Sequence, residues 1–501
     1  MLLAPQTASL PPLTQPTIIG VALAYFAAVA AIGVWATRRT RTARDFFVAG
    51  EGIGLWALAL SAMAATLSGF AFIGGPGLVY ASGVGAVFLV LPAAITNTMG
   101  AWVLAKRMRL LAATRGLITV PDAIGARYRS PLAQGLSGTA MLVAITGYMA
   151  TNFLALGLVL DAIFQTGLAA GIWIGMAVVL AYSASGGILA GIYTDMLQGA
   201  LMALGSALVF VFVLQTGGGM SGLSRSVLAG DPEWLGPWGT MTPMAALSLF
   251  FVFGVGSLGQ PHVVHKFYMI RDPRRLRWYP LLMTLALMIT LLLYFGVGFA
   301  VKALVVRGEL APLARPDDAT PTFLLHHTPV LLAALVFSGV AAAIMSTVNS
   351  LMNIGAAVIT HDLPAAFRRP LPHELRWGRV ATIGISIGAA LIAQISGTLV
   401  ALLGIFGWGL FASTLVPALA IGLNWEGATR AGAIASIATG LGLTLGLETL
   451  VFFGRLTVPA GVTVSGLALV ASLLVFFGVS WLTRREAATG LDPDIRLVME
   501  V

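Results

Sequence analysis

Long apolar stretches separated by short polar ones run along almost the whole chain. Each stretch is close to the roughly 20 residues that a helix needs to cross a bilayer. None shows the alternating segments of about ten residues that form membrane β-barrels. The pattern therefore predicts an all-α polytopic membrane protein with about 13 transmembrane helices. The predicted helices cover residues 17–37, 54–80, 84–105, 132–163, 168–186, 193–215, 242–268, 278–304, 328–360, 378–396, 399–423, 428–453 and 460–483.

The second and seventh stretches carry small and polar residues at the depth where a spanning helix usually has Leu, Ile or Val. Residues 64–70 read AATLSGF and are followed by GGPG at 74–77, whereas residues 254–261 read GVGSLGQP. A helix that unwinds at membrane depth must line a cavity or be buried in protein. Glycine and proline also occur in spanning helices that only kink or pack closely. Interruptions at matching positions of two halves, however, indicate a transporter binding site.

The two interruptions define an internal repeat. Helices two to six and seven to eleven make two blocks of five, and since five is odd, the second block runs inverted relative to the first. This predicts an inverted five-plus-five repeat with one extra helix before it and two after it. The predicted units are an outer N-terminus, first helix and basic cytoplasmic loop (1–53), a first repeat (54–215), an inverted second repeat (242–423), two accessory helices (424–485) and a cytoplasmic tail (486–501).

Composition supports the membrane assignment. The 501 residues are 58% hydrophobic and 9% charged, and the mean hydropathy is +0.93. A soluble domain carries roughly 25% charged residues. There is no cysteine, so disulfides and thiol chemistry are excluded.

The net charge of +9 is distributed unevenly. If the N-terminus lies outside, all but five of the 28 Lys and Arg residues fall in cytoplasmic segments, as the positive-inside rule requires. The five exceptions are Arg225, Lys302, Arg307, Arg315 and Arg455. The basic residues therefore indicate cytoplasmic loops in a lipid bilayer and no nucleic-acid partner. The predicted location is the plasma membrane (bacterial inner membrane), with the C-terminus cytoplasmic.

Few polar residues inside the stretches are chemically informative. Asp195 lies just inside the sixth helix, where a buried carboxylate is either functional or caps the helix amino end. Ser346 and Thr347 are adjacent in the ninth helix, so both hydroxyls can border one cavity. Such hydroxyls and freed backbone carbonyls can coordinate a monovalent cation, although Ser and Thr in spanning helices more often bond the preceding turn.

No enzyme is expected from this sequence. It contains no GxSxG, HExxH or P-loop motif and no Cys/His cluster. The six histidines lie at predicted helix ends or in loops, with no spacing that builds a buried metal site. The absence of a Walker motif gives no sign of ATP as an energy source.

Several short motifs, in their order and spacing, resemble the sodium/solute symporter family, which includes proline, pantothenate, acetate and sugar carriers. The resemblance covers about residues 45 to 425 and is greatest to the bacterial proline carriers. The motifs are DFFVAG at 45–50, YSASGG at 182–187 with Tyr193-Thr194-Asp195 and Gln198, LGQPH at 258–262, MST at 345–347, GWG at 407–409 through Pro417, Asn424-Trp425 and Gly432-Ala433.

The resemblance implies the LeuT-like form of the inverted repeat and a sodium site between the second and ninth helices. The implied ligands are the carbonyl oxygens of Ala64, Leu67 and Ala343 and the hydroxyls of Ser346 and Thr347. Asp195, together with Thr194, would correspond to the family's ion-coupling group near the cytoplasmic exit.

The resemblance also implies a solute site at the two helix breaks. Its residues in this chain would be Ser68, Gly69, Phe70, Tyr148, Phe253, Ser257 and Gln260. The position of Thr66 is an aspartate in proline carriers, and aromatic positions of their site align with Phe70, Phe253 and Ser257. Strict proline specificity is therefore not expected.

The sequence thus predicts a symporter that couples Na⁺ to a small organic solute, an amino acid such as proline or a small carboxylate. The carboxylate is favoured because the amino end of the second half-helix can attract an anion. The alternatives are proton-coupled transport of a similar solute and a transporter-like nutrient sensor. A sensor usually needs an attached signalling domain, and the 16 residues after Arg485 are too few for a kinase. No feature of the sequence specifies an oligomeric state.

Overall fold

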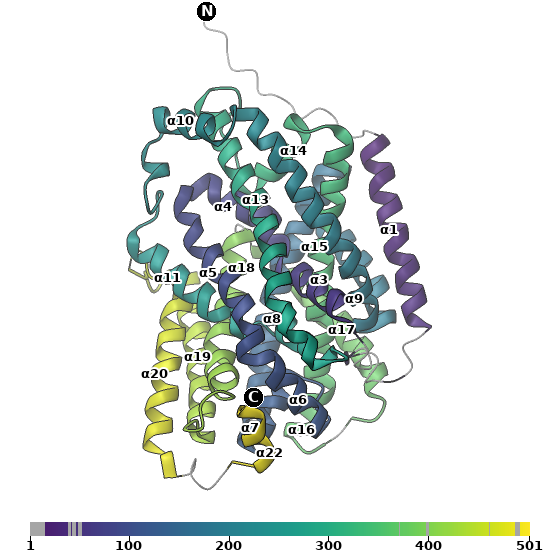
Figure 1. Ribbon diagram of the computed structural model, residues 1–501, viewed down its shortest axis with the longest axis vertical. Coiled ribbons are helices and arrows are strands. Elements are labelled where there is room, and N and C mark those ends of the chain that lie inside the picture. Colours follow the sequence, from purple (N-terminus) through teal and green to yellow (C-terminus); the bar gives the residue numbers. More distant parts are fainter. Residues whose placement is uncertain are drawn as a thin grey trace, which may run out of the picture.

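The structure, a computed structural model, describes residues 16–38, 42, 47–48, 53–369, 371–396, 400–459, 461–485 and 491–500. The predicted outer N-terminus, most of the first basic loop with its DFFVAG motif, and the start of the predicted tail lie outside this part. Within it the chain forms helices and one isolated bridge between Ile53 and Ile270. The helices run mainly along the long axis of the molecule, with α1 at one edge and α20 at the other (Figure 1).

The helices follow the predicted stretches closely. Those up to the middle of the chain are α1 (Pro16–Thr37), α3 (Leu55–Thr66), the π-helix η2 (Phe70–Gly74), α4 (Gly75–Ser82), α5 (Val87–Gly100), α6 (Lys106–Arg115), α7 (Val120–Tyr128), α8 (Pro131–Phe164), α9 (Leu168–Gly217) and α10 (Met220–Gly230). The remaining ones are α11 (Pro243–Gly256), η6 (Ser257–Gly259), α12 (Pro261–Val264), η7 (His265–Met269), α13 (Tyr279–Val306), η9 (Pro316–Asp318), α14 (Ala319–His327), α15 (Val330–Ala357), η10 (Val358–Asp362), α16 (Leu363–Ala366), α17 (Glu374–Ser396), α18 (Val400–Leu415), α19 (Arg430–Phe452), α20 (Val464–Leu482) and α22 (Pro493–Met499).

Eleven helical segments of the described chain are long and apolar enough to cross a membrane, and Leu55–Thr66 and Leu168–Ala181 are shorter apolar helices. One boundary differs from the prediction: the expected helices 168–186 and 193–215 are continuous in α9. The connecting residues 187–192 contain no proline and no polar residue, and their two glycines, Gly187 and Gly191, are accommodated inside the helix. The number 13 itself stays a prediction.

The helices form a central group and a peripheral group. In the most apolar windows of α8, α15 and α18, 83% of the residues are buried, against 22% for α19 and 28% for α1. An apolar helix with most of its residues exposed is suited to contact with lipid. The central helices therefore surround the interior, and the accessory helices lie at the rim.

The predicted interruption of the second stretch is present. Helix α3 ends at Thr66, and Leu67 leaves the helical region with φ −89° and ψ 73°. Ser68 then begins the next helical segment, because its carbonyl accepts the N–H of Ala71 at 2.9 Å and its hydroxyl accepts the N–H of Phe70 at 3.2 Å. A Cβ on Gly69 would lie 2.6 Å from the Cβ of Ala155, so glycine lets α8 approach the break.

The predicted interruption of the seventh stretch is present as well. After α11 and the single turn η6, Gln260 is extended, with φ −73° and ψ 106°. Pro261 explains this conformation, because its ring disfavours a helical preceding residue. Both halves of the bundle therefore contain a broken helix, as the sequence predicts.

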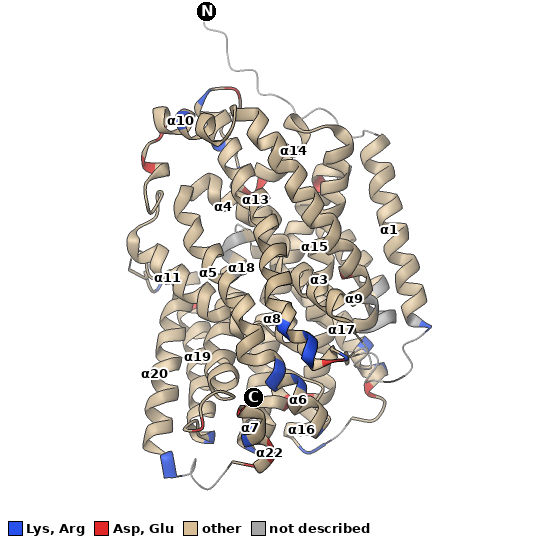
Figure 2. Ribbon diagram, in the orientation of Figure 1, with Lys and Arg blue, Asp and Glu red and all other residues tan. Residues whose placement is uncertain are grey.

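Figure 2 shows that Lys and Arg gather towards the end of the bundle that carries α6, α7 and α22. Among the described residues, two basic side chains are buried. Arg127 is 6% exposed and donates through Nε to the Gly422 carbonyl at 2.7 Å, and Lys266 is 1% exposed. The sequence places Lys266 in a basic cytoplasmic segment but does not predict its burial, which bears on the site described below.

Candidate functional site

The end of α3 and the middle of α15 meet through Thr347. Its Oγ1 lies 2.9 Å from the Ala65 carbonyl oxygen on α3 and 3.1 Å from the Ala343 carbonyl oxygen one turn earlier on α15, and donates to these acceptors. Ser346 is fully buried beside it, and its hydroxyl has no hydrogen-bond partner among the described residues. Buried polar groups normally have partners. The Ser346 hydroxyl is therefore available to a ligand.

All five residues expected to hold sodium are buried at this junction: Ala64, Leu67, Ala343, Ser346 and Thr347. The last carbonyls of a helix lack an N–H partner within the helix. At the end of α3, the Met63 carbonyl accepts the Leu67 N–H and the Ala65 carbonyl accepts from Thr347. Thr347 contacts the carbonyl of Ala65, which was not among the predicted ligands. Neutral hydroxyl and carbonyl oxygens are a donor set that suits a hard monovalent cation.

Asp195 forms a buried network with two other elements. Its Oδ2 accepts from the Ser61 hydroxyl of α3 at 2.5 Å and from Lys266 Nζ of η7 at 2.9 Å. Lys266 also donates to the Ser61 carbonyl at 2.7 Å, and both charged side chains are 1% exposed. Because Asp195 lies in the interior of α9, the alternative of an amino-terminal cap is wrong. Thr194, also buried, donates to the Gly191 carbonyl at 2.9 Å.

The first helix break is tied to α8. The Ser68 hydroxyl lies 3.1 Å from the Tyr148 hydroxyl, and the Gly69 N–H donates to Asn152 Oδ1 at 3.1 Å. Phe70 stacks on Phe253 of α11 with ring centroids 5.7 Å apart and an interplanar angle of 19°. The first break is therefore held next to the second one and next to Tyr148, as the sequence predicts.

The second break is mostly bonded within itself. The Ser257 hydroxyl donates to the Phe253 carbonyl at 2.7 Å, and Gln260 Nε2 donates to the Gly256 carbonyl at 3.0 Å. Gln260 Oε1 is buried without a partner among the described residues. Phe253 also stacks on Trp408 of α18, at 5.0 Å and 19°, so three aromatic rings form one continuous stack with Phe70 at its other end.

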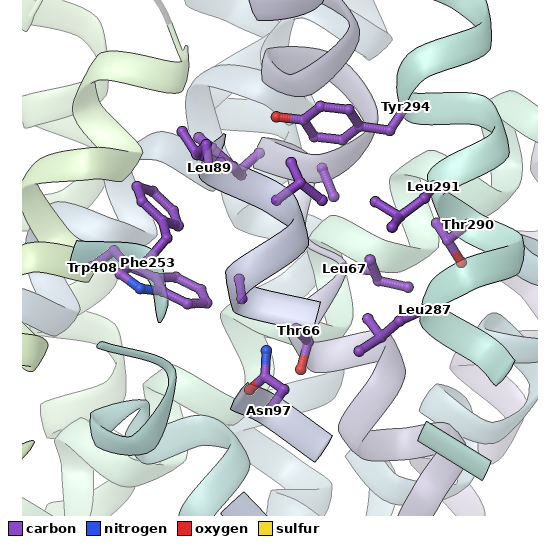
Figure 3. A pocket seen from close by; sticks show the side chains of 14 residues that line it. Thr66, Leu67, Leu89, Asn97, Phe253, Leu287, Thr290, Leu291, Tyr294 and Trp408 are labelled. Atoms are coloured by element: carbon purple, nitrogen blue, oxygen red, sulfur yellow. The ribbon is translucent and has the colours of Figure 1, made fainter. Parts of the chain in front are cut away.

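A cavity of about 50 Å³ lies beside this stack, between the first break, α5, α13 and α18 (Figure 3). Of the seven predicted solute-binding residues, only Phe70 and Phe253 line it. The other lining residues are Thr66, Leu67, Ala71, Leu89, Val90, Ala93, Asn97, Leu287, Thr290, Leu291, Tyr294 and Trp408.

Asn97, Tyr294 and Trp408 were not predicted as site residues. Each has a buried polar group without a partner among the described residues: both amide atoms of Asn97, the hydroxyl of Tyr294 and Nε1 of Trp408. The polar run Thr96-Asn97-Thr98 in the third apolar stretch was a signal that could have located Asn97. No local signal distinguishes Tyr294, because aromatic residues are common in spanning helices.

A charged cluster joins α7 to the end of α15. His361 Nε2 lies 3.1 Å from Asp122 Oδ2, and the Thr119 hydroxyl donates to Asp362 Oδ1 at 2.6 Å. Asp122, His361 and Asp362 each offer a ligand atom within 4.8 Å of the others, a geometry that could hold a metal ion. Sequence spacing had excluded a histidine site, because these residues come from segments far apart in the chain.

On the opposite side of the bundle, Asp317 of η9 is 4% exposed and accepts the N–H of Val400 at 2.9 Å, at the first residue of α18. Burial raises the pKa of Asp317 to about 6, although the Val400 hydrogen bond lowers it. A carboxylate at the amino end of a helix is favourably placed relative to the helix dipole. This hydrogen bond therefore holds the segment between α13 and α14 against the start of α18.

Comparisons with known proteins agree with this architecture. The model of the sodium:solute symporter family matches residues 46–440. The chain is 29% identical to the osmoregulated proline transporter OpuE of Bacillus subtilis, covering 88% of this chain and 93% of that protein. It is 30% identical to the sodium/proline symporter of Haemophilus influenzae, over 89% of each chain. It is 28% identical to the sodium/pantothenate symporter of Escherichia coli, over 87% and 91%.

Solved structures share the fold. A Na⁺-coupled sialic acid symporter in an outward-open state aligns with a TM-score of 0.78 at 18% identity, covering 94% of this chain and 97% of that one. Mhp1, a nucleobase-cation-symport-1 family transporter, aligns with a TM-score of 0.57 at 14% identity, over 91% and 98%. The predicted LeuT-like fold and the predicted family are thereby confirmed.

Proposed function

The chain belongs to the sodium:solute symporter family, and from this membership we propose that it carries a small organic solute across the membrane together with Na⁺ by alternating access. Sodium is the coupling ion of this family. Its relatives are transporters named for proline and pantothenate, and transport rather than catalysis is the activity proposed here.

The sodium ion would be held between α3 and α15 by the carbonyls of Ala64, Leu67 and Ala343 and the hydroxyls of Ser346 and Thr347. The observation that carries this assignment is the Ser346 hydroxyl, which is fully buried and unpartnered within the described residues, next to a threonine that contacts both helices. An ion coordinated by both helices would stabilise their present arrangement. Loss of the ion would favour a different arrangement of α3 and α15.

Asp195 and Thr194 are proposed to couple ion release to movement of the inner side. Asp195, Lys266 and Ser61 join α9, η7 and α3, so these three elements cannot separate without breaking the network. Passage of sodium beside Asp195 would offer the carboxylate another positive charge and weaken its hold on Lys266. This gives the ion a direct means of opening the inner side.

We place the N-terminus outside and the C-terminus in the cytoplasm of a bacterial inner membrane, because the basic residues gather at the end that carries α6, α7 and α22. The proposed inverted repeats are residues 54–215 and 242–423, each of which contains one broken helix. Residues 1–53 would lead into the first repeat, residues 424–485 would form the accessory helices, and residues 486–501 would form the tail.

The test is uptake into vesicles that contain the purified protein, driven by an inward sodium gradient. Proline and pantothenate are the first solutes to try, because relatives are named for them. Sodium-driven uptake that is lost in Thr347→Ala and kept in Thr347→Ser supports the proposal. Uptake that does not depend on the sodium gradient but is abolished by a protonophore favours proton coupling. Absence of uptake for every solute in a broad panel of charged and neutral compounds, together with a Thr347→Ala variant that behaves as the unchanged protein, contradicts transport and favours a sensor.

A further inference from the structure

We propose that the solute is a small neutral molecule that carries the adjacent N–H and C=O groups of an amide, such as a lactam or a cyclic ureide, and that Asn97 recognises this pair. The inference rests on the proposed function and names the substrate class of the cavity beside Phe70 and Phe253. It differs from the amino acid or carboxylate expected from the sequence.

The cavity offers no charged partner to a solute. None of its 14 lining residues is Asp, Glu, Lys, Arg or His. A buried ionised group is costly unless it is paired. Among the proposed sodium ligands only Leu67 lines the cavity, whereas Ala343, Ser346 and Thr347 do not. A carboxylate or an ammonium group would therefore enter without a side chain to neutralise it.

The amino end of the second half-helix is also occupied. The Gly69 N–H is bonded to Asn152 Oδ1, the Phe70 N–H to the Ser68 hydroxyl and the Ala71 N–H to the Ser68 carbonyl. An anion at a helix amino end needs free N–H groups to accept. Since these first three already have acceptors inside the protein, the reason for expecting a carboxylate is absent.

Asn97 supplies the opposite kind of partner. Its side chain is 2% exposed, and neither its amide nitrogen nor its amide oxygen has a hydrogen-bond partner among the described residues. A primary amide presents a donor and an acceptor side by side. A buried amide left unpaired destabilises the protein. A solute with a matching C=O and N–H satisfies both atoms at once, and no carboxylate does so, because it only accepts.

The rest of the cavity suits a compact, largely apolar body. Figure 3 shows Asn97 near Thr66 at one end, Tyr294 at the other, and Leu287 and Leu291 across from Phe253 and Trp408. The stacked rings of Phe253 and Trp408 both line the cavity and give it an apolar side that a small ring can contact. The unpartnered Tyr294 hydroxyl and Trp408 Nε1 can bond a second polar atom of the solute.

The experiment compares ring compounds that differ in charge. The thermal unfolding of the purified protein is measured in saturating sodium chloride with 2-pyrrolidinone, uracil, pyroglutamate or L-proline. The same compounds, in labelled form, are then tested for uptake into vesicles that contain the protein, driven by an inward sodium gradient. We expect 2-pyrrolidinone or uracil to raise the Tm and to enter with sodium, whereas pyroglutamate and proline do neither. Ligands that bind the folded state raise its apparent stability, so binding and transport are read separately.

Variants assign the recognition to Asn97. Asn97→Leu removes both hydrogen-bonding atoms and should weaken the response to the neutral compounds at least tenfold, and Asn97→Asp, which keeps the size, should do the same by removing the donor. The control is Thr96→Val, because the Thr96 hydroxyl donates to its own helix at Pro92. If Asn97→Leu does not fold, the response of Asn97→Asp to the neutral compounds decides whether Asn97 recognises them.

Three results overturn the inference while the proposed function stands. One is sodium-driven uptake of proline or pyroglutamate with no response to either neutral compound. Another is a response to neutral compounds that both Asn97 variants retain. Stabilisation of the protein by sodium without any shift from either neutral compound also overturns it. Failure of the proposed function looks different: no solute enters with sodium and Thr347→Ala behaves as the unchanged protein.

Discussion

Lys266 Nζ lies 2.9 Å from Asp195 Oδ2, and the side chains of both residues are 1% exposed. Removing two charges from water is costly, and their attraction offsets this cost only when further hydrogen bonds satisfy them. Ser61 supplies part of these bonds, since its hydroxyl and carbonyl both contact Lys266, whereas Asp195 Oδ1 has no partner among the described residues. The pair therefore depends on three elements that are distant in sequence.

We expect Lys266→Met to destabilise the protein by about 3–5 kcal/mol, because it leaves Asp195 as an unpaired buried carboxylate. The double variant Lys266→Met/Asp195→Asn should recover most of this loss, because it removes both charges. The measurement is the thermal unfolding of the purified protein with each single and the double variant.

Lys302→Met is the matched control for this cycle. Lys302 pairs with Asp231 at 2.7 Å, but the two side chains are 19% and 32% exposed. Loss of such a pair should cost about 1 kcal/mol or less. A Lys266→Met variant that is no less stable than Lys302→Met would contradict the buried ion pair.

Thr347→Ala should raise the sodium concentration needed for half-maximal thermal stabilisation about tenfold or more, since a hydrogen-bonding or coordinating oxygen to a charged ligand is lost. Ser346→Ala should act in the same direction. The control on the same helix is Ser338→Ala, whose hydroxyl donates to the Ala334 carbonyl at 2.9 Å. Equal sodium dependence in all three variants would exclude the site between α3 and α15.

The sequence was sufficient for the features that depend on local composition. The breaks at Leu67 and Gln260 follow from a glycine-rich run and from Pro261, so the two broken helices could be predicted. The adjacent hydroxyls of Ser346 and Thr347 are conspicuous in an apolar helix, and their role as sodium ligands, which the family resemblance implies, stays a prediction.

The cavity and the ion pair could not be predicted in the same way. Asn97 and Tyr294 line the same cavity only because α5 and α13 pack around the first break. Lys266 lies near several arginines in the sequence, and only the folding of the chain buries it beside Asp195. Such contacts depend on long-range geometry, which no spacing rule supplies.

Asp317 should make the stability depend on pH in a defined direction. Burial raises its pKa from 3.8 to about 6, so between these values the folded state binds more protons than the unfolded one. The stabilisation from this group is therefore complete below about pH 4 and is lost as the pH rises through about 6. Asp317→Asn keeps an acceptor for Val400 but cannot ionise. Its Tm should exceed that of the unchanged protein by an amount that grows from pH 4 to pH 7; a constant difference across this range would contradict the prediction.

Gly75 is the point at which the second half-helix touches the cavity wall. A Cβ there would overlap the ring of Tyr294, whose hydroxyl is buried in the cavity. Gly75→Ala should therefore displace the ring, destabilise the protein by about 1–3 kcal/mol by overpacking and reduce sodium-driven uptake.

Gly442→Ala on α19 is the control, because nothing lies within 4 Å of its Cβ position. In the double variant Gly75→Ala/Tyr294→Ala the clash is gone, so its stability should equal that of Tyr294→Ala alone. Additive losses in thermal unfolding would show that Gly75 acts through some contact other than the Tyr294 ring.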